Sequence, residues 1–539
     1  MENLSDKRTE PTLISDKNRQ RSILIATCTA LMAVIASVSG LNVAQPSLAL
    51  DLDASQGEVL WMINIYAITL AALLLPLGAV GDRWGRKPVL LAGLAIFGVA
   101  NVASGLAPST EVMLGARFLS GVGAAMIMPV TLSVITSVFP DEERSKAIGV
   151  WTAVAGGGGI LGMFLSAALV DLLTWRWLFG LPVVLVAVAA VMTLRAVPNS
   201  REASDHPFDV VGSLLSLVAV VGLIFFLHEG AVQPWTAPET LVSLLVGVGT
   251  AAFFVMWELR RKAPLLDIRL FRKRSLTSGS VSLLVWFGVQ AGVFIVLFPF
   301  FQAVLGWSGL RATLALMPMA VLMMVFSGLA PRLAARVGAR LTMATGMLLG
   351  GTGLALMSVL VSVDEGYLSL LPGMIAMGIG MGFSMAPSTE AIISSLPREQ
   401  QGVASALNDV TREFGTSLGV ALLGAVFTAG YGNAIRLRLE GLEGVPVEAA
   451  QLASRGIADA LVIAGEARPY FEALYRSAQE AFVQGWQQAM WAGVVVMAIL
   501  LVYVLVRGPE SATAHSQDDA ALPTPNGLES LGGSARGKP

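Results

Sequence analysis

Long apolar runs separated by short charged segments dominate the pattern of hydrophobic and polar positions along this 539-residue chain. From Ser22 to Leu50 no charged residue appears, and about 20 apolar residues are enough for a helix that crosses a lipid bilayer. Thirteen further runs satisfy the same criterion. The sequence therefore predicts an all-α polytopic membrane protein with spans near residues 23–46, 59–81, 88–107, 112–138, 147–170, 177–195, 210–228, 240–258, 277–303, 312–331, 341–362, 367–393, 402–428 and 487–506.

Composition and charge distribution agree with this prediction. Hydrophobic residues make up 55% of the chain and charged residues 13%, against about 25% charged in soluble proteins. The single cysteine, Cys28, lies in an apolar run, so the sequence offers no disulfide framework. Most of the 35 Lys and Arg fall in segments on the same side of the membrane as the N-terminus, which places both termini in the cytosol.

The loops divide the predicted helices into six, two and six. The expected organisation is a cytosolic tail (1–21), a six-helix bundle (22–197), a linker with two extra spans and a basic cytosolic loop (198–274), a second six-helix bundle (275–507) containing a long external loop (430–486), and a cytosolic tail (508–539). Repeated halves are common among transporters, where they enclose a central cavity.

The turn between the second and third spans, GAVGDRWGRKP from Gly78 to Pro88, concentrates charge where an apolar run ends. Glycine allows a tight turn, and charged side chains are costly in lipid, so we expect a cytosolic hinge or gate; an ordinary basic loop is the alternative. Asp82 could pair with a basic neighbour or another helix. The gate residues are Gly78, Asp82, Arg83, Gly85, Arg86 and Lys87.

This turn resembles the signature loop of the major facilitator superfamily, and other stretches follow in matching order. RFLSGVGAAMIMP (117–129) resembles the fourth-span motif, and PDEERSKAIGVW (140–151) resembles the next cytosolic turn, which implies Arg144 as the partner of Asp82. GLAPRLAARVGAR (328–340) is a weak echo of the gate motif, with Ala335 in place of Asp82. Fourteen spans, PLLDIRLFRKRS and ALNDVTREFG together resemble the branch of drug/proton antiporters. The resemblance implies the major facilitator fold, with two six-helix bundles plus two extra spans.

The chain departs from that branch at positions that bear on mechanism. Related pumps carry an aspartate in span one where this chain has Ser37, and cation pumps add acids where it has Asn64 and Met323. In the span-five motif, GGGGILGMFLSAAL, Met163 replaces a proline. The resemblance therefore implies transport more firmly than it implies antiport.

Span thirteen carries the clearest candidates for proton coupling. Asp409 and Glu413 are one helical turn apart, and Arg412 lies between them in sequence, so the three can interact along one side of the helix. Two acids that share one base leave one carboxylate incompletely neutralised, which favours proton exchange. The alternative is an ion pair that only fixes helix packing. Arg117, inside span four, joins the candidates through the resemblance.

Polar, aromatic and methionine side chains inside the spans are candidates for a substrate cavity. Methionine suits surfaces that re-pack around varied ligands, although it is also common core filler. No His, Cys or acidic cluster has metal-ligand spacing, and no phosphate-binding loop is present, so we expect neither metal nor cofactor. The cavity candidates are Asn42, Gln45, Asn64, Trp286, Gln290, Met323 and Met381.

Three functions are compatible with these features. The first is a proton-driven exporter of drug-like or antibiotic molecules in a bacterial plasma membrane, working as a monomer. The second is an exporter or facilitator of an endogenous metabolite or lipid-like compound, and the third is a receptor or scaffold. An enzyme and a nucleic-acid-binding protein are not expected. Because the usual acidic positions hold Ser37, Asn64 and Met323, we expect uncharged or anionic amphiphiles to be better substrates than dications.

Overall fold

The computed structural model describes residues 14, 16–201, 208–232, 235–439, 451–454, 456–457, 460 and 471–509, which form helices and no strand. The side chain of Asp16 caps the first helix, and Ser55 and Glu58 form a capping box at the second. The long helices are α1 (Lys17–Asp51), α2 (Gln56–Trp84), α3 (Arg86–Gly105), α4 (Thr110–Val138), α5 (Asp141–Leu172), α6 (Gly180–Ala196), α7 (Val210–Val232), α8 (Pro238–Arg260), α9 (Arg274–Pro299), α10 (Gly309–Val337), α11 (Ala339–Leu360), α12 (Tyr367–Ile393), α13 (Gln401–Leu439) and α16 (Phe471–Arg507).

All 14 of these helices are long and apolar enough to cross a membrane, so the predicted number of spans is confirmed. Short helical segments connect some of them: η1 (Trp175–Leu178), η2 (Ile268–Arg272), η3 (Phe300–Val304) and η4 (Arg398–Gln400). Many outward-facing side chains are aliphatic, such as Leu245, which is 72% exposed. Such a surface suits lipid, because a helix satisfies its own backbone groups in hydrocarbon.

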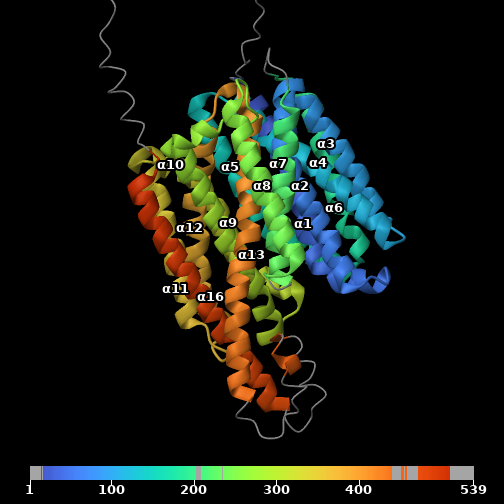
Figure 1. Ribbon diagram of the computed structural model, residues 1–539, viewed down its shortest axis with the longest axis vertical. Helices are drawn as coiled ribbons and strands as arrows, with labels where there is room; N and C mark the ends of the chain where they lie inside the picture. The colour runs from blue at the N-terminus through green and yellow to red at the C-terminus, as the bar shows by residue number, and fades with distance from the viewer. Residues whose placement is uncertain are drawn as a thin grey trace, which may run out of the picture.

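The long helices pack in two groups of six. Helices α1 to α6 contact one another, as do α9 to α13 together with α16. The groups meet where α2 packs on α13 and α5 packs on α10, while α7 contacts both α2 and α13 and carries α8. Figure 1 shows α3, α4 and α6 on one side of the molecule and α11, α12 and α16 on the other. We call these groups the first half and the second half.

Matching turns relate the two halves. Gly85 ends α2 with a φ of 109°, and Gly338 ends α10 with a φ of 89°, a region that favours glycine. Two residues further on, Lys87 donates to the carbonyl of Leu194 at the end of α6, and Arg340 donates to that of Gly508 after α16. The weak sequence similarity between the two turns is therefore accompanied by similar backbone conformations and similar hydrogen bonds.

The two ends of the described chain lie at the same end of the helices. The N–H of Ile14 donates to the carbonyl of Val138 at the end of α4, and Gly508 contacts Arg340 at the start of α11. This end, which also contains the turn at Gly85, is at the top of Figure 1; we call it the Gly85 end. An even number of spans brings the chain back to its starting side.

At the opposite end, α13 and α16 extend beyond their neighbours as a pair (Figure 1). The rings of Phe427 and Phe482 meet edge to face at 4.9 Å, and a methyl group on Gly430 would lie 2.9 Å from the Cα of Gly485. Within the predicted external segment 430–486, α13 continues to Leu439 and α16 already begins at Phe471. Residues 440–450 and 461–470, and the tails 1–13 and 510–539, lie outside the described residues.

Close packing inside the first half makes a testable prediction on α4. A methyl group on Gly123 would lie 2.7 Å from the backbone nitrogen of Phe97, whereas one on Gly115 meets nothing within 4 Å. We expect Gly123→Ala to lower the melting temperature of the purified protein. Gly115→Ala, the same change on the same helix, should keep or raise it, because alanine favours the helix by about 1 kcal/mol. Equal melting temperatures would contradict the tight α3–α4 contact.

Candidate functional site

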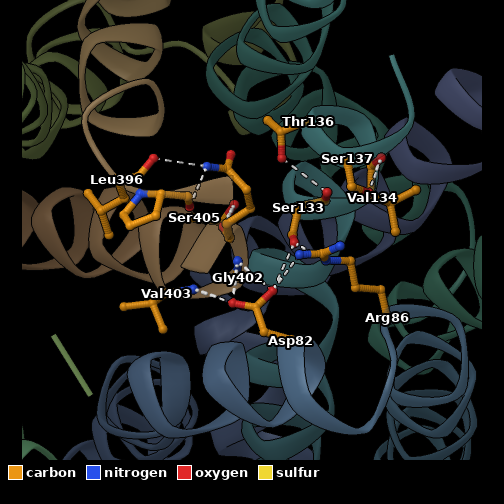
Figure 2. A network of polar contacts seen from close by, with 12 residues as sticks. Asp82, Arg86, Ser133, Val134, Thr136, Ser137, Leu396, Gly402, Val403 and Ser405 are labelled. Carbon is orange, nitrogen blue, oxygen red and sulfur yellow. Dashed lines mark hydrogen bonds and ion pairs between the residues drawn. The ribbon is translucent and has the colours of Figure 1, made fainter. Parts of the chain in front are cut away.

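The carboxylate of Asp82 holds the first turn of α13 across the boundary between the halves (Figure 2). Asp82 is 6% exposed. It accepts the N–H of Gly402 at 2.8 and 2.9 Å and that of Val403 at 3.2 Å. From its own side, Arg86 donates to it at 2.8 Å, and the Ser133 hydroxyl lies at 3.5 Å. The carboxylate is thus neutralised within the first half and bonded to a helix N-terminus in the second.

Glycine permits this contact. A methyl group on Gly78 would come within 2.6 Å of the carbonyl oxygen of Gly402, and one on Gly402 would lie 2.7 Å from Oδ2 of Asp82. The free N–H groups and the macrodipole of a helix N-terminus attract a negative charge. Asp82 therefore joins α2 to α13 through contacts that need both small residues and a carboxylate.

Of the other predicted gate residues, Arg86 and Gly78 take part in this contact, and Arg83, Gly85 and Lys87 lie beside it. The half-buried Arg83 lies in the last turn of α2, before Gly85, and Lys87 follows the turn. The backbone N–H of Arg86 donates to the carbonyl of Ser200 after α6. The resemblance implied Arg144 as the partner of Asp82, and the contacts that the structure gives Asp82 are with Arg86, Ser133 and the start of α13. Both options left open by the sequence are present: Asp82 pairs with its basic neighbour Arg86 and also accepts bonds from another helix, α13.

The α5–α10 contact is the counterpart of the α2–α13 contact but lacks its charge. Ala335 stands where the first half has Asp82. Instead, the Ser327 hydroxyl donates to the carbonyl of Gly149 at 3.1 Å, and Ser145 at the start of α5 donates to Glu390 of α12. The two boundaries are therefore alike in backbone packing and different in electrostatics.

Two turns along α13 from Gly402, the predicted ion pair is present and buried. Asp409 has no exposed surface, and its Oδ1 lies 3.3 Å from Nη1 of Arg412 and 3.3 Å from Nδ2 of Asn408. Within the described residues, Oδ2 of Asp409 has no hydrogen-bond partner. Glu413, half-buried on the next turn, interacts electrostatically with both Arg412 and Asp409.

The guanidinium of Arg412 also reaches the first half. Its Nη2 donates to the carbonyl of Ala155 on α5 at 3.4 Å. Its Cζ lies 4.5 Å from the ring centre of Phe287 on α9 and 5.7 Å from that of Trp151 on α5. A cation over aromatic faces is stabilised by the ring quadrupoles. Arg412 thus touches both halves while neutralising an acid of its own helix.

The fourth coupling candidate, Arg117, lies apart from this group in the first half. It is 1% exposed, and its Nη1 donates to the Ser37 hydroxyl at 3.2 Å while its Nε donates to the carbonyl of Met62 at 3.2 Å. Ser37 in turn donates to Asn101 at 3.1 Å. The serine that replaces the aspartate of related pumps is therefore a direct neighbour of Arg117.

The cavity candidates fall into three groups. Met323 packs against Gly156 of α5, at the boundary of the halves, and Met381 is fully buried in α12. Trp286 is buried near Gly350 and Met497 inside the second half, and it does not lie at the boundary between the halves. The half-buried candidates are Gln45, Asn64 and Gln290; the side chain of Asn42 lies outside the described set.

Sequence reasoning missed residues whose role depends on tertiary contacts. Ser133 and Trp151 lie in apolar helices, and Glu390 near the end of α12 reaches Ser145 of α5. Tyr66, buried under Arg117, was missed as well. Within the described ranges, no group of three His, Cys, Asp or Glu could hold a metal ion.

Two related helical halves, joined by the buried contacts of Asp82 with α13 and of Arg412 with Ala155, are typical of a membrane transporter of the repeated-half type. The family model for the Major Facilitator Superfamily matches residues 27–420. The chain therefore belongs to that superfamily and is a multi-pass transporter of small molecules in the bacterial cell membrane rather than an enzyme.

Characterised relatives include bacterial efflux and resistance proteins. The multidrug efflux pump LfrA of Mycolicibacterium smegmatis is 32% identical over 78% of this chain and 83% of its own. The methyl viologen resistance protein SmvA of Salmonella typhimurium is 29% identical over 90% and 97%. The tetracenomycin C resistance and export protein of Streptomyces glaucescens is 30% identical over 77% and 78%.

Solved structures support the fold at lower identity. A double-tryptophan mutant of XylE matches with a TM-score of 0.60 and 12% identity, over 93% of this chain and 99% of that chain. An inward-facing bacterial homologue of the lysosomal transporter Spinster matches with a TM-score of 0.56 and 19% identity, over 92% and 98%.

The contact at Asp82 makes a prediction about transport rate. Asp82→Asn keeps the shape but removes the charge that faces the start of α13, a loss of about 1–2 kcal/mol at a partly buried helix end. We expect the initial rate of transport in vesicles to fall about tenfold, since 1.4 kcal/mol corresponds to that factor, with normal membrane insertion.

Asp51→Asn is the matched control, because Asp51 is an acid of the same half that accepts a bond from Trp175 at the opposite end. Its rate should stay near that of the wild type. A wild-type rate in Asp82→Asn at equal protein amount would refute the gate.

Proposed function

We propose that this transporter exports drug-like or antibiotic molecules by proton antiport, alternating between states open to either side. The observation that carries the proposal is Arg412, whose guanidinium is bonded both to the buried acid Asp409 and to the carbonyl of Ala155 across the boundary. Three of the relatives are named for multidrug efflux or resistance to toxic compounds. The same site would serve an exporter of an endogenous compound, which remains the alternative.

Protonation would act through this arginine. While Asp409 and Glu413 are ionised, they hold Arg412 near the aromatic rings and Ala155. A proton on either acid removes part of that attraction, and a buried guanidinium with less compensation moves toward another partner or water. The bond to Ala155 would then break, which releases α13 from α5.

The gate contact would follow, because it lies on the same helix. Gly402 and Asp409 are about 10 Å apart along α13 at 1.5 Å per residue, so a shift of the helix changes both sites together. We infer that the Gly85 end faces the cytosol, as the positive charges of its turns indicate. The bond to Asp82 would then close the cytosolic side while substrate leaves outside.

The proposal also covers contacts with lipid and the number of chains in the working unit. The basic segment from Arg260 to Arg274 lies at the Gly85 end and would contact anionic lipid headgroups. The two halves of one chain supply both walls of the transport path, so we propose that the monomer is the working unit. We also propose that residues 22–197 and 275–507 form the two bundles and that residues 198–274 form the linker between them.

Neutralising both acids tests the coupling. We expect the double variant Asp409→Asn, Glu413→Gln to lose accumulation of substrate driven by a pH gradient, by about tenfold or more. Downhill exchange without a gradient should remain, because it needs no net proton movement. Uptake into everted vesicles with and without an imposed gradient measures both quantities.

The chain supplies a matched control for this variant. At the opposite end, Asp364 and Glu480 share Arg476 in the same way, but their side chains are 73% and 42% exposed. Asp364→Asn, Glu480→Gln should therefore keep full accumulation, because exposed pairs contribute about 0–1 kcal/mol. Persistent gradient-driven accumulation in the Asp409, Glu413 variant would show that the buried pair is only structural.

Substrate charge gives a further prediction. A buried dication needs carboxylates nearby, whereas Ser37 bonds to Arg117 and Met323 packs on Gly156. In a host lacking its own pumps, expression should protect against uncharged or anionic polyketide-like antibiotics far more than against divalent cationic antiseptics. Minimal inhibitory concentrations give the ranking. The reverse ranking, abolished by Asp409→Asn, would overturn this prediction and make Asp409 a cation site.

A further inference from the structure

Arg117 is a buried cation without a carboxylate beside it. Its hydrogen bonds go to Ser37 and to the carbonyl of Met62, and no described acid lies within ion-pair distance. A buried charge that lacks a counter-ion costs several kcal/mol. A residue maintained in such a place needs a negative partner in some state of the protein.

Tyr66 lies directly under this cation. The Cζ of Arg117 is 4.3 Å from the centre of the Tyr66 ring, and Tyr66 is 1% exposed. Its hydroxyl has no hydrogen-bond partner among the described residues. Leaving a buried hydroxyl without a hydrogen bond costs about 1–3 kcal/mol of stability. The Tyr66 hydroxyl can therefore donate to a partner in another state of the protein.

The position of Tyr66 identifies that partner. Helix α2 packs on α4, which carries Arg117, and on α13, which carries Glu413. Gly121 of α4 allows the close approach, since a methyl group there would lie 2.9 Å from the carbonyl oxygen of Tyr66. From Val59 to Gly81, α2 itself carries no charged residue. The charged groups that act on the Tyr66 hydroxyl are Arg117 from α4 and Glu413 from α13.

We propose that Tyr66 links Glu413 to Arg117 across the two halves: its hydroxyl donates a hydrogen bond to ionised Glu413 while its ring holds Arg117. Tyr66 is then a positioning residue of the transport cycle, and Arg117 is the distant counter-ion of Glu413. A proton on Glu413 weakens the link and frees the second half to move. This inference deepens the proposed function and rests on it.

Tyr66→Phe tests the link, because it keeps the ring under Arg117 and removes only the hydroxyl. The hydroxyl makes no hydrogen bond in this structure, so the change leaves the packing intact. We expect gradient-driven accumulation to fall about fivefold. The midpoint of its pH profile should move to higher pH, because ionised Glu413 loses a donor that favours the charged form. Tyr431→Phe, at a buried tyrosine that donates to Ala453, should keep the wild-type profile.

A double-mutant cycle separates the link from simple packing. In a Glu413→Ala background, adding Tyr66→Phe should change neither the rate nor the profile, because the acceptor of the bond is already removed. Additive effects, or a wild-type profile in Tyr66→Phe, would overturn the inference. If the Asp409, Glu413 double variant still accumulates substrate, the proposed function itself fails. If that variant is inactive and Tyr66→Phe behaves as wild type, only the role of Tyr66 fails.

Discussion

The structure depends on one unusual bond, in which a carboxylate on α2 of the first half caps the N-terminus of α13 in the second. Burying Asp82 is costly in the absence of partners, and here Arg86, Gly402 and Val403 supply them. The bond can form only when the halves are close at the Gly85 end. It therefore makes the free energy of that closed state depend on one side chain, which is what a gate requires.

The two halves are related, but the bond at Asp82 has no equivalent at Ala335, so the two boundaries between the halves differ. Gly149 and Pro331 meet at the α5–α10 boundary as Gly402 and Gly78 meet at the other, yet Ala335 cannot cap α5. A transporter with identical bonds at both boundaries would tie all of its mobile helices equally. Here the carboxylate that accepts backbone N–H groups lies at the α2–α13 boundary, whereas the contacts of α5 are made by the hydroxyl groups of Ser327 and Ser145, the latter with Glu390. Helix α13 also carries Asp409 and Arg412, so the bond at Asp82 and the proton-binding candidates share one rigid element.

The sequence predicted the spans well and the contacts less well, for a physical reason. Lipid imposes an apolar length on every spanning helix, so the 14 spans can be found from one chain. The acidic pair on α13 was visible as well, because residues three and four apart share a helix face. The bonds from Asp82 to Gly402 and Val403 and the contact of Tyr66 with Arg117 could not be predicted, since both depend on which helices meet. Hydropathy did not mark the continuation of α13 to Leu439, because this part of the helix lies beyond the apolar run.

In the proposed cycle, the strength of the bond at Asp82 has to match the coupling free energy that would break it. An acid at a helix N-terminus contributes up to about 2 kcal/mol, and a coupling free energy between two sites is typically about 1–3 kcal/mol. A second carboxylate at Ala335 would add a comparable contribution at the other boundary and exceed what one proton can overcome. A gate without Asp82 would leave the two states too close in energy for a proton to favour either. One charged cap, two turns from a pair of acids that share one arginine, keeps the two free energies within the same range.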